Sequence, residues 1–150
     1  YLDLWDWIPE RISFDLVPPY RSDGVTGIQG DFLTHEFGRR FDVATCLQVL
    51  EHVPDPVTFG RRLLEIADIV LVSVPHRWPK TAADDHLHDP IDPARLRGWM
   101  GREANHEYVV QEPFRGRVGQ RLIALYHPDP ARRFARRDFK DRIRRNRLGG

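Results

Sequence analysis

The sequence predicts an α/β fold in which a mostly parallel sheet ends in a C-terminal antiparallel hairpin. Three observations predict it. A strand, a helix and a second strand follow one another between positions 41 and 74. The second of these strands is apolar without alternation, which is typical of parallel strands covered on both faces. Two strand-like segments, at 106–112 and 121–127, have no helix between them, so we expect them to pair antiparallel.

Two short apolar segments come first in the chain. Residues 12–15 are followed by Pro18 and Pro19, and residues 25–29 are closed by Gly30. Proline has no N–H to donate and avoids the interior of strands. These breaks therefore predict two short strands, at residues 12–15 and 25–29.

A strand–helix–strand unit follows. Residues 41–47 and 69–74 are its two apolar runs, and Asp55 and Pro56 mark the start of the helix between them. Aspartate is a favoured N-cap, and proline fits the first helical position. The predicted buried stripe of this helix consists of Phe59, Leu63 and Ile66.

A second, shorter helix precedes the closing hairpin. Asp92 and Pro93 repeat the same start signal, and the helix is predicted to continue through Met100. Its predicted buried face consists of Leu96, Trp99 and Met100. The two strands of the hairpin then follow, joined by a loop that contains Gly116 and Gly119.

Length and composition set broad limits. The 150 residues fit one domain, and 41% of them are hydrophobic, which excludes a disordered or fibrous chain. No apolar run approaches the ~20 residues that cross a bilayer, and the sequence has no signal-peptide pattern. Cys46 is the one cysteine, so neither an intramolecular disulfide nor a cysteine-based zinc site is expected. We expect a soluble, cytoplasmic protein in which Cys46 is inert core.

The net charge of +1 conceals an uneven distribution. Residues 131–150 contain eight Arg and one Lys against two Asp, so residues 1–130 are acidic. Within this tail Ala135, Phe139 and Ile143 recur every fourth residue and predict a basic amphipathic helix. We therefore divide the chain into an α/β domain, 1–130, and an Arg-rich helical tail, 131–150. Its positive charge predicts that the tail binds an acidic surface, which is its own domain, a nucleic acid or an anionic membrane.

The most specific stretch is FDVATCLQVLEHVPD, residues 41–55. It resembles the fourth strand and following turn of the class I S-adenosylmethionine-dependent methyltransferases. Asp15, the Gly30–Phe32 segment and the Val72–Pro75 segment stand where that family has the ends of its second, third and fifth strands, and the closing hairpin resembles its sixth and seventh strands. The resemblance covers roughly residues 11–127. It implies a Rossmann-like sheet and methyl transfer from S-adenosylmethionine, with a small molecule as the favoured methyl acceptor.

The resemblance also implies a set of cofactor contacts. Asp15 would accept hydrogen bonds from the ribose diol, and Asp31 would accept one from the adenine amino group. Phe32 would cover one face of the adenine, while Leu47 and Gln48 would line its other side. Without the resemblance, Asp15 is equally consistent with an acidic residue that only ends a strand. Asp31 and Phe32 are equally consistent with a turn followed by an ordinary core aromatic residue.

One part of the family pattern is missing. The family begins with a strand and a glycine-rich turn, and no such motif precedes Asp15. The segment Tyr1–Trp5 resembles the opening strand, but Trp5 stands in place of the first glycine. Six residues then separate Trp5 from Ile12, and a parallel crossover needs about a dozen. We expect the chain to lack the first strand and helix of a complete enzyme.

Candidate acceptor-site residues follow the fourth and fifth strands of the family pattern. His52 is a candidate catalytic base, although it equally suits a helix cap. His76, His86 and His88 are candidate acceptor contacts. Because one short loop rarely supplies a full ligand set, the Asp84–Asp89 cluster predicts a polar lid and no metal site.

These observations leave two functional interpretations. The first is S-adenosylmethionine-dependent methyl transfer to an unidentified acceptor, with a small molecule favoured. The alternative is a non-catalytic, partial methyltransferase fold that acts as a binding module. In that case the basic tail would contact a nucleic acid or a protein partner. The missing glycine-rich turn and the tail favour this second interpretation.

Overall fold

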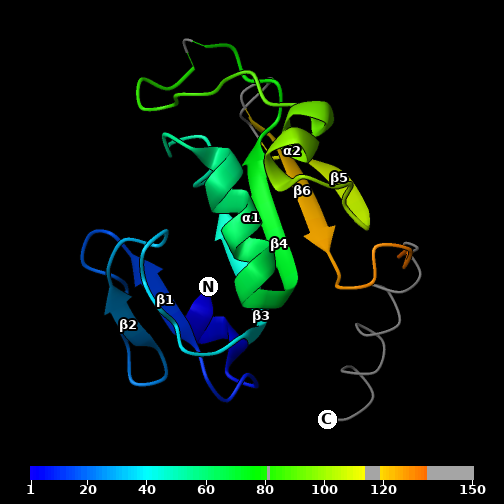
Figure 1. Cartoon of the computed structure of the whole chain (residues 1–150). Coiled ribbons are helices and arrows are strands. Elements are labelled where there is room, and N and C mark those ends of the chain that lie inside the picture. The colour runs from blue at the N-terminus through cyan, green and yellow to red at the C-terminus, as the bar shows by residue number, and fades with distance from the viewer. Residues whose placement is uncertain (81, 114–118, 135–150) are drawn as a thin grey trace. The chain divides into compact units, whose positions relative to one another are not determined.

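The computed structural model describes residues 1–80, 82–113 and 119–134, and within them the chain forms two units (Figure 1). The first unit is Tyr1–Gly38, and the second begins at Arg39. The elements in chain order are η1 (Leu2–Trp5), β1 (Ile12–Asp15), β2 (Thr26–Gln29), β3 (Phe41–Leu47), α1 (Pro56–Ile66), β4 (Ala67–Pro75), α2 (Pro93–Met100), β5 (His106–Gln111) and β6 (Gln120–Tyr126).

The first unit contains a parallel pair of strands. β1 and β2 run in the same direction, with Ile12 opposite Thr26 and Asp15 opposite Gln29. Phe14 of β1 points into an aromatic cluster, its ring centroid 6.0 Å from that of Phe32 and 5.1 Å from that of Phe37. The two strands that the proline and glycine breaks predict are therefore confirmed, and aromatic rings fill the space beside them.

The Tyr1–Trp5 segment, which resembles an opening strand in sequence, forms the 3₁₀ helix η1 and no strand. The amide of Leu4 donates to the Tyr1 carbonyl at 2.9 Å, so the backbone bonds within the turn rather than to a strand. Asp3 fixes the turn from its side chain, because its carboxylate accepts hydrogen bonds from the hydroxyls of Tyr20 and Ser22.

The second unit contains a four-stranded sheet in the order β3-β4-β6-β5. β3 and β4 are parallel, with Phe41 opposite Ala67, and the β5–β6 hairpin adds antiparallel to β4. The core runs along β4, where Val70, Val72 and Val74 are completely buried. The predicted mostly parallel sheet with an antiparallel closing hairpin is confirmed.

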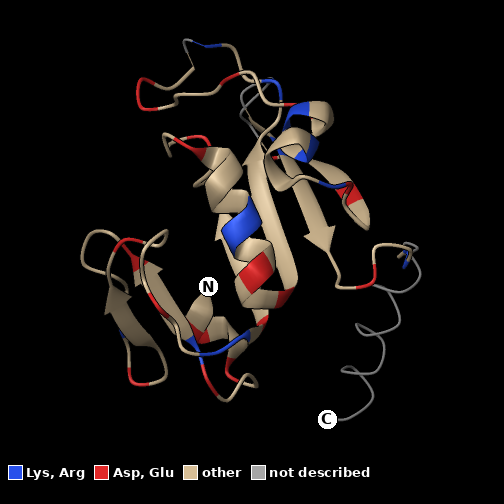
Figure 2. Ribbon diagram, in the orientation of Figure 1, with Lys and Arg blue, Asp and Glu red and all other residues tan. Residues whose placement is uncertain are grey.

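Both helices begin at the predicted caps. The Asp55 carboxylate accepts from the amides of Val57 (3.1 Å) and Thr58 (3.0 Å) at the start of α1. The Asp92 carboxylate accepts from the amide of Arg95 at 2.9 Å at the start of α2. The exposed face of α1 carries its charged side chains (Figure 2).

α1 packs on β4 and against α2, and the two helices approach most closely at Gly60 (Figure 1). A Cβ atom at Gly60 would lie 2.8 Å from the Met100 sulfur and 3.2 Å from the Trp99 carbonyl oxygen. Glycine therefore permits the backbone contact that brings the buried faces of the two helices together.

Two further predictions concern the ends of the fold. The predicted tail helix falls mainly on residues 135–150, which lie outside the described residues, and residues 131–134 form a turn and irregular backbone. In the described part of the chain, β1 pairs only with β2, and β3 pairs only with β4. The strand pairings do not test whether a first strand and helix are missing, so that expectation stays a prediction. No helix among the described residues is long and apolar enough to span a membrane.

Candidate functional site

The site is built by two loops that follow the parallel strands β3 and β4. Leu47 at the end of β3 lies opposite Ser73 near the end of β4, so both loops leave the same edge of the sheet. In open α/β sheets, ligands bind beyond this carboxyl edge. The loop between β4 and α2 also carries acidic residues (Figure 2).

Hydrogen bonds tie the two loops to each other. The amide of Leu87 donates to the Glu51 carbonyl at 2.8 Å. The Nε2 atom of His88 lies 2.7 Å from the Val53 carbonyl oxygen, and Nδ1 of His52 lies 3.1 Å from the Asp85 carbonyl oxygen. The loops therefore form one structure although about thirty positions of sequence separate them.

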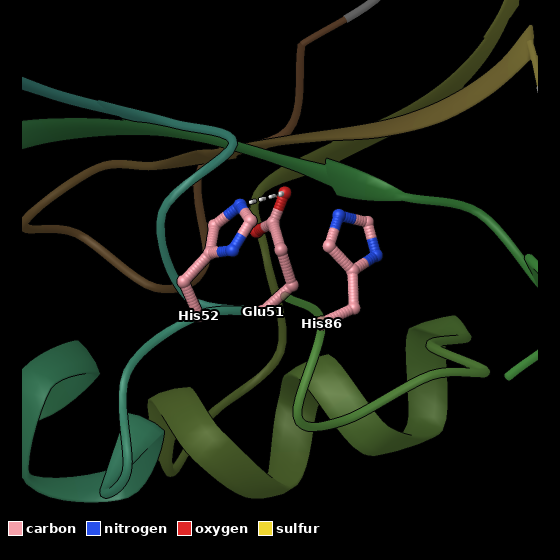
Figure 3. Close-up of side chains that lie close together, drawn as sticks. All are labelled: Glu51, His52 and His86. Atoms are coloured by element: carbon pink, nitrogen blue, oxygen red, sulfur yellow. Dashed lines mark ion pairs between the residues drawn. The ribbon is translucent and has the colours of Figure 1, made fainter. Parts of the chain in front are cut away.

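Glu51, His52 and His86 converge where the loops meet (Figure 3). One ligand-type atom of each residue lies within 4.8 Å of the corresponding atom of the other two. Figure 3 shows the side chains of Glu51, His52 and His86 close together, with the Glu51 carboxylate beside the two imidazole rings. The closest charged contact of this carboxylate is His52, with Nε2 3.9 Å from Oε1.

The Glu51 carboxylate is the most unusual group in the cluster. The side chain is fully buried, and neither of its oxygens has a hydrogen-bond partner among the described residues. Burial raises the pKa of this carboxyl group, while the residue's own backbone amide and then the neighbouring His52 and His86 act in the opposite direction. Because buried carboxylates are normally paired, this arrangement leaves Glu51 ready to take up a proton or a cation.

His86 is held rigidly beside Glu51. Its Nδ1 atom lies 2.6 Å from Oδ2 of the buried Asp89, and its ring stacks on Trp78 with the centroids 5.5 Å apart. Trp78 is itself fixed, since its Nε1 donates to the Gln120 carbonyl at 3.0 Å. The ring of His52 meets that of His86 edge to face at 4.8 Å.

Leu47 is the last residue of β3, and Gln48 directly follows it. Gln48 has a φ of 57°, a conformation that costs a non-glycine residue about 1 kcal/mol or more. Its backbone amide donates to the Ser73 carbonyl at 2.8 Å, and its side-chain amide donates to the Ser73 hydroxyl at 3.0 Å. The chain therefore turns sharply at Gln48 as it leaves the sheet.

The other predicted cofactor residues belong to the first unit. Asp15 is exposed at the end of β1, where its Oδ1 accepts from the Val17 amide at 3.2 Å. Asp31 is exposed after β2, and its Oδ1 accepts from the Leu33 amide at 2.9 Å. Phe32 lies in the aromatic cluster of that unit. Both carboxylates stabilise turns, and their roles toward a cofactor stay predictions.

The remaining candidate histidines do not join the cluster. His88 is held by its bond to Val53, and its ring meets Trp99 edge to face at 5.4 Å. Burial lowers the pKa of His76, whose Nδ1 has no hydrogen-bond partner among the described residues. Of the predicted catalytic and acceptor residues, the structure thus brings together His52 and His86.

Sequence reasoning overlooked Glu51, because it considered a metal site only within residues 84–89. Glu51 and His86 belong to different loops, and a search within one loop does not join them. A usable signal was present, since both loops follow neighbouring parallel strands. Cys46, by contrast, behaves as predicted: it is buried, and burial raises the pKa of its thiol to about 12.

Comparison with known proteins gives related sequences but no matching family model. The chain is 33% identical over 101 residues to a ubiquinone biosynthesis O-methyltransferase of Xanthomonas oryzae pv. oryzae, covering 52% of this chain and 42% of the relative. It is 41% identical over 56 residues to the protein of the same name from Pseudomonas aeruginosa, covering 35% of this chain and 24% of the relative. The chain thus spans less than half the length of these curated relatives.

Solved structures with a similar arrangement are distant in sequence. The N-terminal domain of EvdMO1 with SAH bound matches with a TM-score of 0.48 and 15% identity, covering 70% of this chain and 54% of that one. LepI in complex with SAM matches with a TM-score of 0.49 and 13% identity, covering 83% of this chain and 39% of that one.

Three findings bear on the family. The β3-β4-β6-β5 order places the closing hairpin as the resemblance implies, and β1 and β2 form the parallel pair that it also implies. The related sequences are methyltransferases by name. The chain therefore has the fold of the class I S-adenosylmethionine-dependent methyltransferases.

Proposed function

We propose that this protein is a methyltransferase that transfers the methyl group of S-adenosylmethionine to a hydroxyl group of a small molecule. One observation carries the proposal. The polar cluster of Glu51, His52 and His86 lies at the carboxyl edge of the parallel strands, where ligands of such sheets bind. The similarity to relatives that are O-methyltransferases by name supports the same chemistry.

The cofactor contacts of the proposal are those that the family resemblance implies. Asp15 accepts hydrogen bonds from the ribose hydroxyls, and Asp31 accepts one from the adenine amino group. Phe32 covers the adenine, while Leu47 and Gln48 line its opposite side. Methyl transfer is an in-line displacement at a sulfonium carbon, so holding the two reactants in line is the main requirement.

His52 is the proposed catalytic base. Its Nδ1 faces the Asp85 carbonyl oxygen, an acceptor, so the ring proton belongs on Nδ1. The lone pair of Nε2 is then free to take a hydroxyl proton from the acceptor. His86, which lies beside His52, contacts the acceptor together with His76 and His88.

A transfer assay tests this function. S-adenosylmethionine labelled in its methyl group is incubated with the chain and a panel of small hydroxylated compounds, amines and RNA. We expect label in a hydroxylated compound, and a loss of at least about 100-fold in rate for His52→Ala. His106→Ala, which changes a histidine of β5, is the matched control. Label in RNA, or in none of the acceptors, contradicts the proposal.

The alternative, a non-catalytic binding module, depends on the basic tail. Its predicted helix lies mainly outside the described residues, and the relatives found are named as enzymes. These findings do not favour it.

A further inference from the structure

We propose that Glu51, His52 and His86 bind a divalent transition-metal ion. This inference rests on the proposed function and refines it. The three side chains come from two loops and meet in one place (Figure 3). They offer one carboxylate and two imidazoles, a set of three protein ligands that leaves coordination positions open for water or substrate.

The first argument is the state of Glu51. Its side chain is fully buried, and both of its carboxylate oxygens lack a hydrogen-bond partner among the described residues. A buried carboxylate without partners is costly and therefore rare. A cation between Glu51 and the two histidines would supply the missing partner for these oxygens.

The second argument is the orientation of the histidines. Nδ1 of His52 lies 3.1 Å from the carbonyl oxygen of Asp85 and 3.3 Å from its carboxylate. Nδ1 of His86 lies 2.6 Å from the carboxylate of Asp89. Because oxygen acceptors face both Nδ1 atoms, the ring protons belong there, and both Nε2 atoms keep a lone pair. A metal ion requires that tautomer when it binds through Nε2.

The third argument is the layer behind the ligands. Metal-binding histidines nearly always donate their second ring N–H to a carboxylate or a backbone carbonyl. Here His86 faces a carboxylate and His52 faces a carbonyl. Asp89 is itself buried, with its side chain 1% exposed, so it holds the His86 ring in one orientation.

The distances are somewhat longer than those around a bound ion. The ligand atoms lie within 4.8 Å of one another, and two tetrahedral ligands at about 2.1 Å from one ion are roughly 3.4 Å apart. The widest pair must therefore close by about 1.4 Å when an ion binds. His52 can make this movement by side-chain rotation, because its side chain is 35% exposed.

The donor set selects the kind of ion. Imidazole suits Zn²⁺, Fe²⁺ and Ni²⁺, whereas Mg²⁺ and Mn²⁺ prefer oxygen ligands. A bound ion of this kind would act as a Lewis acid toward an acceptor oxygen and favour its deprotonated form. The bound ion narrows the class of methyl acceptor to compounds whose hydroxyl oxygen can bind a metal ion. In that case His52 serves as a ligand rather than as the base.

Direct metal binding tests this inference without any methyl transfer. The chelator-treated chain is titrated with Zn²⁺ against a chromophoric chelator, and with Co²⁺ while its visible absorption is recorded. We expect one ion per chain, the absorption of nitrogen-coordinated Co²⁺, and an affinity for Mg²⁺ that is at least about 100-fold weaker. No saturable binding of Zn²⁺ or Co²⁺, or equal binding of Mg²⁺, overturns the proposal.

Variants assign the ligands. H52Q and H86Q are expected to weaken Zn²⁺ binding by more than about 100-fold, and Asp89→Asn by about 10- to 100-fold. H106Q removes a histidine of β5, outside both loops, and we expect it to bind Zn²⁺ within threefold of the unchanged chain. Because His52 is partly exposed, H52Q keeps the test informative even if H86Q fails to fold. Unchanged Zn²⁺ affinity in H52Q overturns the assignment.

The outcome is separable from that of the proposed function. S-adenosylhomocysteine binding is measured with and without the chelator on the same protein. Zn²⁺ binding without S-adenosylhomocysteine binding supports the metal site and contradicts the methyltransferase function. The reverse result overturns the metal site and leaves the function standing.

Discussion

Asn105 shows how a single buried amide holds the base of the closing hairpin together. Its Nδ2 donates to the carbonyl oxygens of Asp129 and Arg132, each at 2.8 Å. Its Oδ1 accepts from the amide of His127 at 2.7 Å. Together these bonds satisfy backbone groups on the segment that follows β6.

Replacement of this amide is expected to be costly. Asn105→Ala removes the hydrogen-bond partner of three half-buried or exposed backbone groups, and we expect it to lower the free energy of unfolding by about 1–3 kcal/mol. Urea denaturation followed by circular dichroism measures the change. Gln111→Ala changes an exposed amide at the other end of β5, and it should cost less than about 0.5 kcal/mol. Equal losses in the two variants would contradict this role for Asn105.

Cys46 gives a test at high pH. Burial raises the pKa of its thiol from 9.0 to about 12, so the folded state keeps the proton that the unfolded state releases above pH 9. Stability therefore falls as the pH rises from about 9 toward 12, by about 1.4 kcal/mol for each pH unit from this group alone. Cys46→Ala removes the contribution.

The measurement is the free energy of unfolding of both proteins between pH 8 and pH 10.5. The advantage of the unchanged chain over Cys46→Ala should be constant up to about pH 9 and should then shrink. If the unfolding free energies of the two proteins differ by a constant amount over this whole range, the Cys46 thiol does not retain its proton in the folded state.

The individual elements follow from local signals that act within a few residues. Asp55 and Asp92 each stand directly before a proline, and both cap a helix as predicted. The apolar run of β4 gives a largely buried strand for the same local reason, because apolar residues follow one another there without polar alternation. The 3₁₀ helix at Tyr1–Trp5 depends on more than local signals, because the hydrogen bonds to Asp3 come from Tyr20 and Ser22, which lie far along the sequence.

The α1–α2 contact yields a paired prediction. Gly60→Ala gains helix propensity, but its Cβ would press on the backbone carbonyl of Trp99, so we expect a net loss of about 1–2 kcal/mol in stability. Gly98→Ala has open space around its Cβ and should gain about 0.5–1 kcal/mol. Thermal and urea denaturation of both variants give the comparison. A stabilised Gly60→Ala would show that the helices are not in close contact there.

At the scale of the whole molecule, the site depends on how the strands are ordered. The sequence predicted that residues 48–55 and 76–92 follow parallel strands, and it identified His52 and His86 separately. It could not predict that Glu51 is buried beside them with no hydrogen-bond partner for its oxygens among the described residues, because that depends on the packing of two loops. The order of strands nevertheless placed both loops at one edge of the sheet.

The same scale explains why the predicted cofactor residues stay predictions. Asp15, Asp31 and Phe32 belong to the first unit, and Leu47 and Gln48 belong to the second. The sequence also has no glycine-rich turn before Asp15, the element through which the family holds the methionine end of the cofactor. We therefore expect this chain to bind the cofactor more weakly than a methyltransferase that has the turn.

The most direct test of the account is a calorimetric titration of the 150-residue chain with S-adenosylhomocysteine. The account predicts saturable binding at one site, with a Kd above about 100 μM, and a further loss of about tenfold in affinity for Asp31→Ala. A Kd in the low micromolar range would contradict the expected lack of the first strand and turn. No saturable binding at millimolar ligand, or affinity unchanged in Asp31→Ala, would contradict the cofactor site itself.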